Sequence, residues 1–140
     1  MSDTFENEVT VTRGGFPALG SKVGLIQADV TIGGVMATAG DVNQVFEFES
    51  NTLVLCAGLT VLVPTTNTVN ADLGLAGGAE LLAASDVSAA AGTTYEGGCL
   101  LANVIIDAGD TLDLSISADA GAAGSVRVWA LVADIGDAEG

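Results

Sequence analysis

The sequence predicts an antiparallel β-sandwich, because apolar and polar residues alternate with period two and turn-forming residues recur between short segments. In residues 111–117, three aliphatic side chains alternate with Asp113, Ser115 and Ser117. One side of this strand is therefore expected to face a core and the other to face water. No segment has the 10–15-residue helical pattern that a parallel sheet needs for its crossovers. The same alternation marks three further strands, at residues 8–12, 26–32 and 46–49.

More continuous apolar runs complete the set of expected strands. The runs at 53–56, 59–63, 99–106 and 126–133 are typical of strands that are covered on both faces or lie at an interface. Clusters of Gly, Pro, Asn and Asp separate them, as turns require. This spacing predicts about eight strands in an all-β fold.

Residues 79–91 are ambiguous, because Ala and Leu favour a turn of helix. Gly77, Gly78 and Gly92 enclose this stretch and leave little length for a helix. We therefore expect a short strand followed by a loop.

The chain divides into two parts. Residues 23–140 have the pattern of a single sandwich domain, and 140 residues suit one core. Residues 1–22 have a different character and are predicted to form an N-terminal arm, with a frayed terminus as the alternative. Arg13 and Lys22 carry two of the three positive charges, which suits the arm to a contact that the acidic body would resist.

The charge of the chain excludes several kinds of partner. Eighteen acidic residues against three basic ones give a formal charge of -15. Such a chain repels nucleic acid and anionic membranes. The charge suits solubility at high copy number or contact with a basic partner surface. No segment has the length of a membrane helix, and residues 1–8 lack the pattern of a signal peptide, so synthesis in the cytoplasm is expected.

The chemistry needed for catalysis is missing from the sequence. There is no histidine, so triads that depend on histidine are impossible and the commonest metal ligand is lacking. No nucleotide-binding glycine motif is present. We therefore expect a protein that is not an enzyme, with no catalytic residues, no cofactor and no metal site.

Two groups of residues leave alternatives open. Asp107, Asp110 and Asp113 are interpreted as turn aspartates, with a calcium site as the alternative, although their spacing differs from that of an EF-hand loop. Cys56 and Cys99 lie in apolar runs and are interpreted as buried thiols, with a cross-strand disulfide as the alternative.

Four segments together carry a family resemblance. They are Asn70–Gly78, Leu81–Tyr95, Ala108–Ile116 with its Asp-Thr-Leu-Asp-Leu motif, and Ala120–Val132. In this order they resemble small virion structural proteins of tailed bacteriophages, over residues 53 to 135. The Gly97-Gly98-Cys99-Leu100 stretch and the arm depart from the pattern, so contact residues are not carried over from the family.

The resemblance implies a jelly-roll-like β-sandwich that serves as a capsid decoration or cement protein, or as part of a head fibre. It places the protein on the outer capsid surface of the virion, bound to the major capsid protein. We further expect a homotrimer or homodimer built through an apolar strand face. The candidate residues for contact with the capsid or with other copies are Phe5, Arg13, Phe16, Pro17, Lys22 and Trp129.

Two other functions remain as alternatives. A head-fibre or adhesion module would bind a host surface ligand through loops such as 64–70 and 92–98. A small enzyme is disfavoured, because a nucleophile, a base and an oxyanion site cannot be assembled from named residues.

Overall fold

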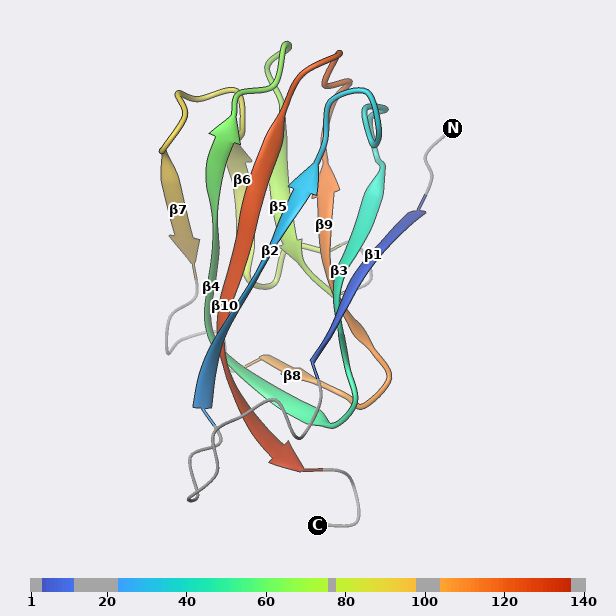
Figure 1. The fold of residues 1–140 in the computed structure, drawn as a ribbon, viewed down its shortest axis with the longest axis vertical. Coiled ribbons are helices and arrows are strands. Elements are labelled where there is room, and N and C mark those ends of the chain that lie inside the picture. Colours follow the sequence, from blue (N-terminus) through green and yellow to red (C-terminus); the bar gives the residue numbers. More distant parts are fainter. Residues whose placement is uncertain (1–3, 12–22, 76–77, 98–103, 137–140) are drawn as a thin grey trace.

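The computed structural model describes residues 4–11, 23–75, 78–97 and 104–136 of the chain. They form ten strands and, within these ranges, no helix (Figure 1). A helix long and apolar enough to cross a membrane is accordingly not found there. The strands are β1 (Thr4–Val11), β2 (Val23–Thr31), β3 (Val42–Phe48), β4 (Asn51–Val63), β5 (Asn70–Gly74), β6 (Leu82–Asp86), β7 (Thr94–Gly97), β8 (Val104–Ile106), β9 (Thr111–Ile116) and β10 (Ser125–Gly136).

The strands form two sheets that pack as a sandwich. The first sheet has the order β1-β3-β9-β5-β6, and the second has the order β2-β10-β4-β7, with β8 also paired to β4. Every pairing among the described strands is antiparallel except that of β1 with β3. The predicted all-β antiparallel sandwich is therefore confirmed, apart from this one parallel pair and with more strands than the eight or so expected.

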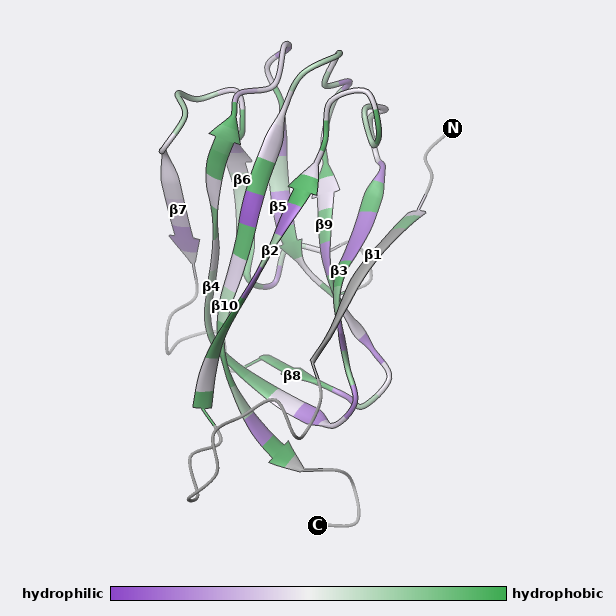
Figure 2. Ribbon diagram, in the orientation of Figure 1, coloured by the Kyte–Doolittle hydropathy of each residue, from purple (hydrophilic) through white to green (hydrophobic). Residues whose placement is uncertain are grey.

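The inner faces of both sheets meet in one aliphatic core. Leu59 and Val128 come from the second sheet, and Leu114 comes from the first. The rings of Phe46 and Phe48 add the aromatic part, with centroids 6.4 Å apart. Hydrophobic and hydrophilic residues alternate along the strands in Figure 2, as expected for sheets with one buried face.

The alternation predicted for residues 26–32 is confirmed in β2. Ala28, Val30 and Ile32 are buried, whereas Gln27 and Asp29 are exposed. Period-two patterning was sufficient here because β2 is the terminal strand of its sheet and its outer side is not sheltered by neighbours on both sides.

The same reasoning was wrong for the polar side of β9. Asp113 and Ser115 are only 3% and 8% exposed, although they were expected to face water. The strand lies in the middle of the first sheet, with Gln44 of β3 and Gly74 of β5 directly beside Asp113. The hydroxyl group of Thr111 donates a hydrogen bond to Oδ1 of Asp113 (2.6 Å), which helps this carboxylate to remain buried.

The ambiguous stretch contains strand β6, followed by a turn. This confirms the preference for a short strand and loop over a helix. Strand β6 pairs with β5 and is the terminal strand of the first sheet.

Part of the expected arm lies in the first sheet. Residues 4–11 form β1, which pairs in parallel with β3 at the edge of that sheet. Residues 12–22 lie outside the described residues. The contact role of the arm therefore stays a prediction.

Three loops are joined at one end of the sandwich, namely the β2–β3, β4–β5 and β9–β10 loops. The backbone N–H of Ile32 donates to the carbonyl group of Gly124 (2.9 Å), and that of Asn67 donates to Ala120 (3.1 Å). Because their backbone groups are paired with one another, these loops are held in one arrangement.

The interpretation of Cys56 as a buried free thiol was wrong. Cys56 is half-buried and disulfide-bonded. Cys99 is the only other cysteine in the sequence, and it lies outside the described residues.

We predict that protein purified without reductant contains a Cys56–Cys99 disulfide. Such a bond closes a loop of about 40 residues and, by loop entropy, stabilises the fold by about 4 kcal/mol. Alkylation followed by peptide mass spectrometry without reduction will give one cross-linked peptide pair. Recovery of two alkylated thiols from folded protein would contradict this prediction.

Candidate contact surfaces

The structure places two of the six predicted contact residues. Phe5 of β1 is half-buried and packs against the core, and Trp129 is half-buried on the outer side of β10. The two residues belong to different sheets, so they do not form one site. The other four candidates, at positions 13, 16, 17 and 22, lie outside the described residues.

Trp129 covers the strand next to its own. It lies opposite Gly58 of β4 in the sheet register. A Cβ atom on Gly58 would collide with the indole ring and with the backbone oxygen of Tyr95. Gly58 thus leaves the space into which the indole packs, and Trp129 is an anchor on the outer face of the sheet.

An apolar surface follows on the same side of the second sheet. Directly paired residues in antiparallel strands point to the same face, so the register defines lateral rows. One row runs Val23, Ala133, Leu53, Ile105, and the next contains Leu25 and Leu131. We call these six residues the apolar face.

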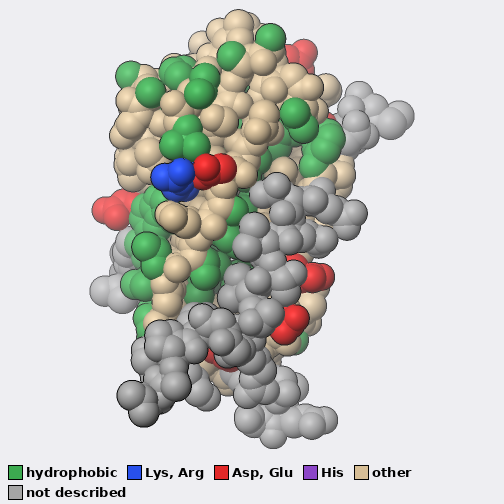
Figure 3. All heavy atoms as spheres, in the orientation of Figure 1, with side chains coloured by type: hydrophobic (Ala, Val, Ile, Leu, Met, Phe, Trp, Pro, Cys, Tyr) green, Lys and Arg blue, Asp and Glu red, His purple; other side chains and the backbone are tan. Residues whose placement is uncertain are grey.

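The side chains of the apolar face are unusually exposed for their type. Leu25 is 64% exposed, Ile105 is 50% exposed and Val23 is 46% exposed. The space-filling view in Figure 3 shows hydrophobic side chains gathered on this side of the molecule. Contiguous apolar surface of this kind marks sites where proteins bind other molecules.

Toward the joined loops, the row next to the apolar face contains Trp129 and the exposed carboxylate of Glu96, and a polar row follows it. Nε of Arg127 donates to Oδ1 of Asp29 (2.7 Å), and Nη2 donates to Oδ2 (3.1 Å). The hydrogen bond from Arg127 lowers the pKa of Asp29, and the carboxylate raises the pKa of the guanidinium. In the same row the hydroxyl groups of Thr60 and Thr94 are 2.9 Å apart. In Figure 3 a basic and an acidic side chain touch midway along the molecule.

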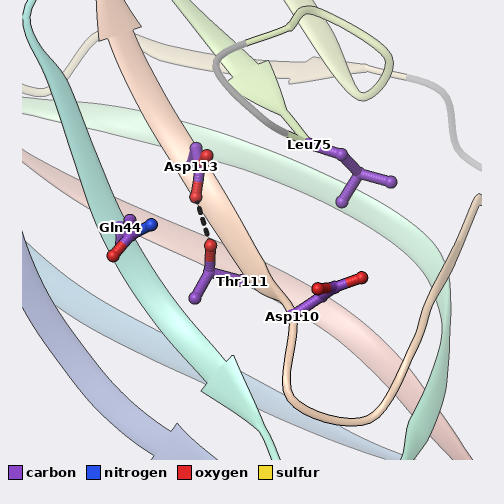
Figure 4. Close-up of a pocket in the computed structure, with 5 residues that line it drawn as sticks. All are labelled: Gln44, Leu75, Asp110, Thr111 and Asp113. Atoms are coloured by element: carbon purple, nitrogen blue, oxygen red, sulfur yellow. Dashed lines mark hydrogen bonds between the residues drawn. The ribbon is translucent and has the colours of Figure 1, made fainter. Parts of the chain in front are cut away.

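The first sheet carries a different, acidic feature. A pocket of about 250 Å³ is lined by Gln44, Leu75, Asp110, Thr111 and Asp113 (Figure 4). Asp113 and Thr111 are already hydrogen-bonded to each other there. Among the described residues of this lining there is no histidine, cysteine or lysine, so the titratable groups are carboxylates and the hydroxyl group is that of Thr111.

The three aspartates of the possible calcium site lie in different surroundings. Asp107 and Asp110 lie in an exposed turn, where the N–H of Asp110 donates to the carbonyl of Asp107 (3.0 Å). Asp113, by contrast, is buried within β9. Across the described ranges, no group of three acidic or cysteine side chains is arranged to hold a metal ion.

Sequence reasoning missed Val23 and Leu25 as members of an exposed apolar face. The signal was present, because both share the outward side of β2 with Gln27 and Asp29. Ile105 gave no such signal, since its role depends on the pairing of the short strand β8 with β4.

Comparison with known proteins identifies the fold. No protein-family model matches this sequence, and neither does any curated protein sequence. A chain in the solved structure of the capsid of Ralstonia phage GP4 matches with a TM-score of 0.67 and 19% identity, covering 90% of this chain and 98% of that one. A chain in the cyanophage Pam1 capsid asymmetric unit matches with a TM-score of 0.61 and 20% identity, covering 84% of this chain and 89% of that one. The sandwich described above is thus a fold that occurs in phage capsids.

We predict that Gly58→Ala displaces the Trp129 indole. The added methyl group overlaps the ring and the β7 backbone, so the variant should lose about 1–3 kcal/mol of stability. Trp129 is the only tryptophan, so the emission maximum of intrinsic fluorescence reports its surroundings directly. Thr60→Ala on the same strand is the matched control and should leave that maximum unchanged. An unshifted maximum in Gly58→Ala would refute the packing described here.

Proposed function

We propose that this protein is a non-enzymatic capsid decoration, or cement, protein of a tailed bacteriophage that binds the outer surface of the head and stabilises the mature shell. The observation that carries the proposal is the match to a chain of the Ralstonia phage GP4 capsid, of which 98% is covered. Because nearly all of that chain corresponds to this one, the likeness concerns a whole virion component rather than a shared module.

The physical properties of the chain support a structural role. Many side-chain hydrogen bonds of the described residues stabilise turns, loops and strand pairs such as Asp29–Arg127, and the described lining of the pocket in the first sheet has only carboxylates as titratable groups. A sandwich closed around an aliphatic core needs no cofactor for its stability. Decoration proteins act by mass action, because a protein that binds the expanded shell better than its precursor stabilises the expanded form.

The charge of the chain indicates what kind of shell surface it would meet. A formal charge of -15 favours a basic patch on the major capsid protein and keeps unbound copies soluble. Arg13 and Lys22 of the predicted arm would then serve contacts with acidic groups between neighbouring shell subunits.

A head-fibre or adhesion module is the second candidate. The joined β2–β3, β4–β5 and β9–β10 loops favour it, because a preorganised loop end is a common form of ligand site. This function predicts binding to host cells and no effect on shell strength.

The decoration proposal predicts saturable co-sedimentation with expanded capsids of the encoding phage from which native copies have been stripped. Bound protein should raise the temperature at which the particles break, because binding stabilises the shell. Unexpanded precursor shells are the control and should bind more weakly. Absence of binding to expanded shells, together with binding to host cells, would favour the adhesion function instead.

A further inference from the structure

We propose that β1 is a releasable strand, which leaves the edge of the first sheet as a unit while the rest of the sandwich stays folded. The inference rests on how residues 4–11 are attached to β3, and above all on one buried amide beside Phe5, that of Asn43. It goes beyond the proposed function and does not depend on it.

The first argument is the form of the ladder between β1 and β3. This pairing is parallel, whereas the other described pairings of the first sheet are antiparallel, and a parallel pairing is slightly less stable per residue. A register shift between Glu6 and Val9 divides the ladder into two parts of three residue pairs each. Because β1 is the terminal strand of its sheet, it has a ladder on one side only (Figure 1).

The second argument is a polar side chain inside an apolar row of the core. Directly paired residues point to the same face, so the register defines a row across the inner face of the first sheet. This row takes one residue from each of the five strands, namely Phe5, Asn43, Leu114, Leu73 and Leu82. Asn43 is its polar member, and it belongs to the strand to which β1 is attached.

The amide oxygen of Asn43 is buried without a hydrogen bond. Asn43 is only 6% exposed, and no donor among the described residues is within hydrogen-bond distance of its Oδ1 atom. Phe5 lies on one side of Asn43 in the row, and Leu114 lies on the other. Burial of an unpartnered polar atom is unfavourable, because its hydrogen bonds to water are lost and not replaced. Part of the free energy gained when Phe5 docks is therefore lost at Asn43.

The third argument is the contrast with the opposite edge of the sandwich. There the terminal strands β6 and β7 are joined by a hydrogen bond from Oη of Tyr95 to the carbonyl group of Asp86 (2.9 Å). Gly97 of β7 lies so close to the carbonyl oxygen of Leu81 that a Cβ atom would collide with it. The two sheets are thus fastened to each other at this edge. At the other edge, the described core contact of β1 is that of the half-buried Phe5.

The sandwich retains its core when β1 is released. Strand β3 keeps its antiparallel ladder with β9, and the rings of Phe46 and Phe48 stay between the sheets. Release makes β3 the terminal strand, so Asn43 can be hydrated and the backbone groups on the free side of β3 are exposed. A free edge of this kind accepts another extended strand. The released state therefore offers a strand edge that the docked state hides.

The test is amide hydrogen exchange of the full-length protein, resolved by residue with NMR. The hydrogen-bonded amides of β1 should exchange at similar rates, and at least about 100-fold faster than those in the middle of β10, because release does not require global unfolding. Rates that rise steadily toward Thr4 would indicate a frayed terminus and overturn the inference. Exchange of β1 that is as slow as that of β10 would overturn it as well.

Asn43→Leu tests the role of the buried amide. Leu is close to Asn in size, removes the unpartnered oxygen and adds an apolar contact with Phe5. It should slow the exchange of the β1 amides, relative to those of β10, by about tenfold. Gln44→Leu is the matched control, because Gln44 is the next residue of β3 but points to the outer face, and it should leave this ratio unchanged. A ratio that is the same in wild type and Asn43→Leu would overturn the inference.

Phe5→Ala changes the same contact from the side of β1. Loss of the ring weakens docking, so the exchange of the β1 amides should become about tenfold faster while that of the β10 amides stays as in wild type. Equal acceleration in β1 and β10 would show that β1 unfolds only together with the core, which contradicts the proposal.

Discussion

The pairing of β10 with β2 on one side and with β4 on the other organises this molecule. Along its length β10 turns small aliphatic residues toward the core and Arg127, Trp129 and Leu131 toward the outside. The same backbone hydrogen bonds therefore set the register of the core and that of the outer rows. A shift of one residue in this register would turn the core side chains outward and the outer side chains inward, so that neither the core nor the outer rows could form.

The two sheets have outer faces of different character. The outer side of the second sheet combines an uncharged apolar face with an open strand edge, whereas the first sheet presents the pocket with Asp110 and Asp113. The net negative charge of the chain therefore lies on other parts of its surface, where it would favour contact with basic groups or with water.

Local pattern was enough to predict the fold class, but not the site. Alternation identified β2 and the buried pair Phe46 and Phe48, because the burial of each side chain there follows from its position along its own strand. It failed for Asp113, whose burial depends on the neighbouring strands β3 and β5. Trp129 was identified by residue type alone, whereas its packing over Gly58 arises from the pairing of strands that are about 70 residues apart in sequence. The disulfide at Cys56 likewise depends on tertiary structure, which spacing in the sequence does not reveal.

The proposed function is that this sandwich decorates a phage head. The most direct measurement is cryo-electron microscopy of mature particles of the encoding phage, at a resolution that traces β-strands. We expect copies of the sandwich on the outer surface of the shell, at regular positions and near full occupancy. A shell that lacks the sandwich, with the protein found only in fibres or absent from the particle, would contradict it.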